Sequence, residues 1–159
     1  GKGPALGLGS GSLKPINAKN DTEYHSSSVY AGSFDYQWPL SSWLSTSLMV
    51  HESGGEGSMP TKSEYKYYKS GIIGLQLKIW MGPLYLGVHG GQYYLTWIKS
   101  MSAYSGIQQA GGSGYSIGFE TSSGWFLAAF SDQSETFSFD EMPDQQVEGN
   151  RVMLGYRWK

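Results

Sequence analysis

The C-terminal segment, residues 151–159, alternates in chemistry with the two-residue period of a β-strand. One face is apolar and ends in aromatic rings: Val152, Leu154, Tyr156 and Trp158. The opposite face carries two arginines, a methionine and a glycine: Arg151, Met153, Gly155 and Arg157. A strand with these two faces separates an apolar medium from a polar, crowded one, and it needs partner strands of the same kind.

The composition suits a sheet with one lipid-facing surface. Charged residues make up 15% of the chain, below the roughly 25% of an average soluble domain, and 23 of the 159 residues are glycine. Aromatic residues make up another 15%. At this length we expect one domain, residues 1–159. A soluble all-β barrel that binds a ligand has a similar composition, so that alternative stays open.

Several function classes are excluded by the sequence. The net charge of -2 and the lack of a basic run argue against nucleic-acid binding. The glycines at Gly7, Gly9 and Gly11 precede no helix, and no His, Asp and Glu spacing indicates a metal, so we expect no cofactor. No apolar run is long enough for a transmembrane helix. The N-terminus has no apolar signal segment, which is expected of a mature chain.

Eight segments have the alternation of strands: 4–13, 24–38, 43–52, 65–80, 84–97, 114–120, 125–139 and 151–159. Short turns and long polar loops alternate strictly between them. An even strand number with short turns at one end and long loops at the other is typical of outer-membrane barrels. The sequence therefore predicts an all-β fold, an eight-stranded antiparallel up-and-down transmembrane β-barrel.

The alternation also predicts which side chains face outward. In 43–52 the outward set is Leu44, Thr46, Leu48 and Val50. In 84–97 a bulge at the Gly90-Gly91 pair is expected to turn three side chains outward: Tyr93, Leu95 and Trp97. In 125–139 the side chains assigned outward are Phe126, Ala128 and Phe130, with Ser131 and Gln133 inward.

Aromatic residues gather near the short turns, as expected of a lipid-facing interfacial girdle. The girdle residues are Tyr36, Trp38, Trp43, Trp80, Tyr85, Phe119, Trp125, Tyr156 and Trp158. A second group lies on the long-loop side: Tyr24, Tyr65, Tyr67, Tyr68, Tyr93, Tyr94 and Trp97.

The terminal strand and the rhythm of strands and turns resemble the small eight-stranded outer-membrane barrels. These are represented by the transmembrane domain of outer membrane protein A and by outer membrane proteins X and W. One detail departs from that pattern: Lys159 follows Trp158, where the family commonly ends on the aromatic residue. The resemblance implies an outer membrane of the Gram-negative type as location. It also implies membrane lipid, lipopolysaccharide and the outer-membrane assembly machinery as partners.

Four charged residues point inward near the short turns: Asp35, Lys78, Glu120 and Arg157. Eight strands enclose a lumen that side chains can fill, and unpaired charges there are costly. We therefore expect a structural ion-pair network. A proton or ion pathway is the alternative.

An enzymatic reading depends on His25 and Ser27, which share one strand face at a loop end. Some barrels of this size act on lipid A, but no third catalytic member can be placed here. His51 and His89 are isolated and are expected to be interior residues. Catalysis is therefore a weak candidate.

The long loops, 53–65, 100–112 and 133–146, suit contacts with an extracellular partner. We expect a non-enzymatic barrel that acts in surface interaction, adhesion or membrane integrity. A narrow pore and a channel for small hydrophobic molecules remain alternatives.

Overall fold

A computed structural model describes residues 1–11, 13–59, 64–100, 103–104, 106–140 and 142–159. The described residues form ten strands. Their bounds are β1 Gly3–Gly11, β2 Lys14–Asn17, β3 His25–Pro39, β4 Leu44–Gly57, β5 Tyr67–Met81, β6 Leu84–Ser100, β7 Ala103–Tyr104, β8 Gln108–Glu120, β9 Trp125–Ser134 and β10 Gln145–Arg157. The described ranges contain no helix with the length and apolarity needed to cross a membrane.

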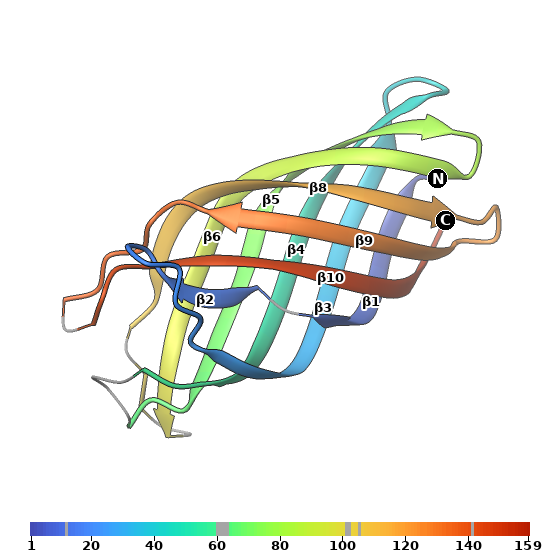
Figure 1. Ribbon diagram of the computed structural model, residues 1–159. Coiled ribbons are helices and arrows are strands. Elements are labelled where there is room, and N and C mark those ends of the chain that lie inside the picture. The colour runs from blue at the N-terminus through green and yellow to red at the C-terminus, as the bar shows by residue number, and fades with distance from the viewer. Residues whose placement is uncertain (12, 60–63, 101–102, 105, 141) are drawn as a thin grey trace.

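Eight of these strands close into a ring, in the order β1-β3-β4-β5-β6-β8-β9-β10. Every pairing is antiparallel, and β10 closes the ring by pairing with β1. The two chain ends lie together at the end of the barrel that carries the short turns (Figure 1). The eight-stranded up-and-down barrel predicted from the sequence is therefore confirmed.

Two short strands lie outside this ring. Strand β2 continues along β10 beyond the end of β1, and β7 pairs with the end of β6. Both belong to segments that the sequence predicts as loops. Strands β4, β8 and β10 also extend further toward the loops than predicted. Their outer parts consist of glycine and polar residues apart from Ala110 and Val147, so the hydrophobic alternation stops there although hydrogen-bonded pairing continues.

Bulky apolar side chains cover the outside of the barrel. Leu8 is the most exposed of them, at 77%. Others that are exposed include Phe34, Leu48, Leu75, Leu86, Ile117, Leu127 and Leu154. The side chains of opposite parity are buried, including Ser45, Ser47, Met49 and His51 on β4. The outward face predicted for residues 43–52 is therefore confirmed.

The bulge predicted at Gly90 and Gly91 is wrong. The register between β5 and β6 is continuous there, with Gly91 opposite Gly74 and Gly90 opposite Leu75. Without a shift in parity, Tyr93, Leu95 and Trp97 point into the lumen and are fully buried. The barrel interior near the long loops is wide enough for these large rings, and they fill it.

The faces predicted for β9 are also wrong. Trp125 and Leu127 are exposed, whereas Phe126, Ala128 and Phe130 are buried. Phe126 stands directly opposite Gly155, where an added Cβ would lie 2.4 Å from the Phe126 ring. The glycine therefore provides the interior volume for this ring. The strand ends at Ser134, before the predicted end at position 139.

The aromatic residues divide differently at the two ends of the barrel. Near the short turns, those exposed on the outside are Tyr36, Trp38, Trp43, Phe119, Trp125 and Trp158, and Tyr156 is partly exposed beside them. Tyr85 is instead buried inside, and the Trp80 indole donates to Ser45 Oγ. At the other end, Tyr67 is exposed, but Tyr24, Tyr68, Tyr93 and Trp97 are buried. The second group is therefore mainly an interior cluster.

Candidate functional site

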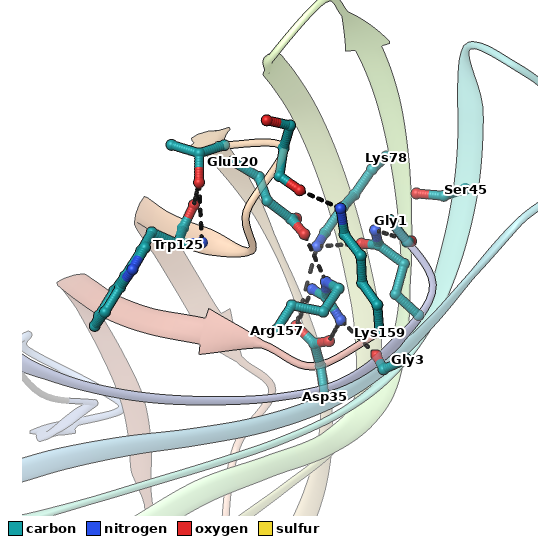
Figure 2. Close-up of polar contacts among 12 residues, drawn as sticks. Gly1, Gly3, Asp35, Ser45, Lys78, Glu120, Trp125, Arg157 and Lys159 are labelled. Atoms are coloured by element: carbon teal, nitrogen blue, oxygen red, sulfur yellow. Dashed lines mark hydrogen bonds and ion pairs between the residues drawn. The ribbon is translucent and has the colours of Figure 1, made fainter.

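A charged cluster fills the lumen at the short-turn end, and its centre is Arg157 on β10 (Figure 2). Arg157 Nη1 and Nη2 donate to the two carboxylate oxygens of Asp35 at 2.5 and 3.1 Å. Arg157 Nε donates to Glu120 Oε1 at 2.8 Å, and Nη1 also donates to the Gly3 carbonyl at 2.7 Å. The guanidinium therefore joins β1, β3, β8 and β10. A forked, charge-assisted contact of this kind is directional as well as strong.

Lys78 approaches the same cluster from β5. Its ammonium donates to Gln37 Oε1 at 2.7 Å and lies 4.0 Å from Asp35 Oδ2. It also lies over the Tyr85 ring, 4.6 Å from the ring centroid. Two acids and two bases thus meet in one buried group, where each charge has an opposite partner.

The structure therefore brings together the four residues singled out by their inward parity: Asp35, Lys78, Glu120 and Arg157. Strand pairing places them at one level because each belongs to the short-turn end of its strand. Glu120 Oε2 is buried and has no hydrogen-bond partner among the described residues.

A second charged cluster lies in the lumen around Asp132 on β9, closer to the long loops than the first cluster. Arg151 Nη2 donates to Asp132 Oδ2 at 2.5 Å, and the Tyr93 hydroxyl donates to Oδ1 at 2.6 Å. His89 Nε2 also makes a short contact with Oδ1. The side chains of Asp132 and His89 are fully buried, and Arg151 is nearly so. This carboxylate therefore has three protein partners in the middle of the barrel.

Sequence reasoning missed this second cluster because it assigned the wrong face to β9. Reversing that face turns Asp132 inward, since it has the parity of Phe126 and Phe130. One signal was available: Arg151 lies on the same face of the terminal strand as Arg157. A buried arginine needs a carboxylate partner, and Asp132 is the acid nearest to it along the neighbouring strand.

The Phe130 ring packs at the centre of the second cluster. The Arg151 guanidinium lies 5.3 Å from its centroid, and the His51 ring meets it edge-on at 4.7 Å. Arg151 Nε and Nη1 and the Nδ1 atoms of His51 and His89 have no hydrogen-bond partner among the described residues. The mid-lumen surface is therefore partly polar and partly aromatic.

Near the long loops, the interior is closed by larger side chains. Trp97 packs edge-on against Tyr24 and Tyr68, and its indole donates to Gln145 Oε1 at 2.9 Å. The backbone at Leu13 enters this layer, where its amide donates to Ser53 Oγ and its carbonyl accepts from Ser70 Oγ. The backbone at Leu13, just before β2, is therefore tied to β4 and β5 inside the barrel.

The weak catalytic candidates, His25 and Ser27, both lie on β3. The side chain of His25 lies outside the described part of the chain. Ser27 Oγ donates to Glu56 Oε2 at 3.3 Å in an exposed position, and a register shift separates residues 25 and 27. Among the described residues, no group of three or more acids and histidines could hold a metal ion.

Several solved structures are similar to this chain. Neisserial surface protein A superposes with a TM-score of 0.64 at 8% sequence identity, over 98% of this chain and 97% of that protein. Ail, the attachment invasion locus protein of Yersinia pestis, superposes with a TM-score of 0.61 at 10% identity, over 99% of this chain and 100% of Ail.

The complex of Ail with the heparin analogue sucrose octasulfate gives a TM-score of 0.61 at 12% identity, with the same coverage. No protein-family model matches the sequence, and no curated protein matches it. At these identities the likeness is one of fold. The chain therefore has the fold of the small eight-stranded outer-membrane β-barrels.

Proposed function

We propose that this chain is an integral outer-membrane barrel with a filled lumen and no enzymatic activity, acting in surface interaction, adhesion or membrane integrity. The observation that carries the proposal is the inverted arrangement of the side chains. Leucine, isoleucine and aromatic residues are exposed on the outside, while arginine, lysine and aspartate pair inside. Such a surface is stable against lipid and unfavourable in water.

The same arrangement disfavours a soluble ligand-binding barrel. Such a protein keeps its apolar side chains inside, around the ligand, and its polar side chains outside. Here the interior holds two charged clusters and an aromatic layer at successive levels. Membrane lipid and lipopolysaccharide are then the immediate surroundings of the wall, and assembly into the membrane requires the machinery for barrels of this class.

The long loops are the surface offered to a partner. The connection 135–144, between β9 and β10, carries four acids, Glu135, Asp140, Glu141 and Asp144, and no lysine or arginine. The solved complex of Ail contains a sulfated sugar, but a polyanion would be repelled by this loop. We therefore expect an extracellular partner with a cationic or neutral polar surface.

The membrane assignment is tested by refolding the protein in detergent micelles. Gel mobility is compared with and without boiling, and circular dichroism is recorded in micelles and in plain buffer. We expect an unboiled β-rich species with its own mobility that persists only with detergent. A monomer that is folded and soluble in plain buffer would contradict the assignment.

The surface role is tested in cells that display the barrel. Replacing residues 135–144 by a short turn should reduce adhesion and leave the permeability of the outer membrane unchanged. A loss of the permeability barrier with unchanged adhesion would favour membrane integrity as the function. Heat-dependent mobility of the variant provides the control that it is folded.

A further inference from the structure

The outer wall of β8, β9 and β10 contains a polar hollow of about 730 Å³. On these three strands the hollow lies on the long-loop side of the apolar positions. The last fully apolar row across them is Ile117, Ala129 and Val152. The next row is Tyr115, Ser131 and Asn150, and the row after that is Ser113, Gln133 and Glu148. The hollow is lined by these two rows and by further residues of neighbouring positions: Gly11, Lys14, Val88, Gly114, Asp132 and Gly149.

On β9 this polar surface begins nearer to the short turns than the polar surface of β5 does. The outward positions of β5 stay apolar from Met81 as far as Ile73. On β9 they become polar at Ser131, after only Trp125, Leu127 and Ala129. Counted from the short turns, the apolar band is therefore shorter on β9 than on β5 by two outward positions.

The polar side chains of the hollow are available to a ligand. Asn150, Gln133 and Ser113 are exposed, and Ser131 and Glu148 are partly exposed. None of these five side chains makes a hydrogen bond or ion pair within the described part of the chain. Unpaired amides and hydroxyls next to lipid are unfavourable, so a polar molecule is expected to cover them.

The charges identify the kind of head group. Lys14 is held by Glu23 at 2.6 Å, which leaves Glu148 as the unpaired charge of the hollow. A phosphate would meet a surface that is neutral or acidic. Amides, serines and one carboxylate are suited instead to sugar hydroxyls, and the Tyr115 ring, 67% exposed at the lower rim, offers an apolar face for a sugar ring.

We propose that this hollow binds the sugar head group of an outer-leaflet glycolipid, with its acyl chains on the apolar rows directly below. The polar rows of the wall lie toward the long loops and the apolar rows toward the short turns. This order matches a lipid whose polar head group faces the long loops and whose acyl chains face the short turns. The inference rests on the proposed membrane location. It assigns a specific site on one side of the barrel, beyond general contact with lipid.

The test uses the purified barrel in mixed micelles and native mass spectrometry. The probes are rough-type lipopolysaccharide, its deacylated core oligosaccharide, and phosphatidylethanolamine. The variant is the pair Gln133→Leu and Asn150→Leu. The matched control is Gln92→Leu, which removes an exposed amide on β6 outside the hollow.

We expect the unchanged barrel to retain one lipopolysaccharide in preference to phosphatidylethanolamine. The double variant should lose affinity by about fivefold for each hydrogen-bonding side chain removed. The Gln92→Leu control should bind as before. If the double variant does not fold, Ser131→Ala with Asn150→Ala removes polar groups from the same row without adding apolar bulk.

Four binding results would each overturn the proposal. These are unchanged retention by the folded double variant, equal loss in the control, equal retention of phosphatidylethanolamine, and equally tight binding of the deacylated oligosaccharide. A dimer that disappears in the double variant would assign the hollow to a second copy of the chain and also overturn it. Heat-dependent mobility and detergent dependence are measured on the same samples, so failure of the membrane assignment is seen separately.

Discussion

Arg157 shows how much of the short-turn end depends on one side chain. It provides hydrogen bonds to two carboxylates and a backbone carbonyl, all from a buried position. Removing one member of a buried charge cluster lowers stability far more than replacing the whole cluster with apolar residues. The remaining charges keep their desolvation penalty but lose their partner. The carboxylates of Asp35 and Glu120 are the groups that would be left behind.

Substitution Arg157→Met should therefore lower the free energy of unfolding by about 3–5 kcal/mol. The measurement is urea unfolding in micelles, followed by tryptophan fluorescence. Lys159→Met is the matched control, since Lys159 is an exposed base at the same end of the barrel. Adding Asp35→Asn and Glu120→Gln to Arg157→Met should recover part of the loss. Absence of any recovery would argue against the charge explanation.

The pair of Asp132 and Arg151 can be tested by a double-mutant cycle. Asp132→Asn leaves a buried arginine without its carboxylate, and Arg151→Met leaves a buried carboxylate without its arginine. Each single substitution is expected to cost about 3–5 kcal/mol of unfolding free energy. The double substitution should cost less than the sum, with a coupling of about 0.5–3 kcal/mol. Strict additivity would show that the two side chains act independently.

At the scale of strands, large rings repeatedly stand opposite glycines. Direct cross-strand pairs of this kind are Tyr85 with Gly118, Phe126 with Gly155, Tyr68 with Gly55, Tyr94 with Gly71 and Tyr30 with Gly54. A ring that lies over a glycine covers its backbone and occupies the space of the missing side chain. The high glycine content therefore has a packing role on both faces of the wall.

Gly118→Ala tests this pairing. An added Cβ at Gly118 would lie 2.3 Å from the ring of Tyr85, which is buried and cannot move freely. We expect a loss of about 1–3 kcal/mol of unfolding free energy from overpacking. In a Tyr85→Leu background the same substitution should cost much less. An equal cost in both backgrounds would place the strain elsewhere than at the ring.

The sequence predicts strands well where one face meets lipid and the other meets the lumen. The alternation in 65–80 and 151–159 is clear for that reason, and it places Lys78 and Arg157 correctly inside. Prediction fails where both faces have the same character. Along 125–130 aromatic or apolar residues occupy both parities, so the pairing of Trp125 with Tyr156 decides the face. The sequence alone does not contain that register.

For the molecule as a whole, the question is whether the lumen is a plug or a pathway. Lys78→Glu separates the two, because it places a third carboxylate beside Asp35 and Glu120. Under the plug hypothesis the barrel becomes less stable than with Lys78→Met, and the unchanged protein shows no conductance in planar bilayers. A Lys78→Glu variant of unchanged stability and raised conductance would instead support an ion pathway.

The seam between β1 and β10 joins the two ends of the chain. Arg157 donates to the carbonyl of Gly3 across 154 positions of sequence. Before β10 has been synthesised, strands β1 to β9 can form only an open sheet. Such a sheet has two unpaired edge strands and an exposed apolar face. Completion must wait for β10, because only its pairing with β1 closes the ring. Closure of the wall therefore depends on β1 and β10 together, and the ring cannot form before both have been made.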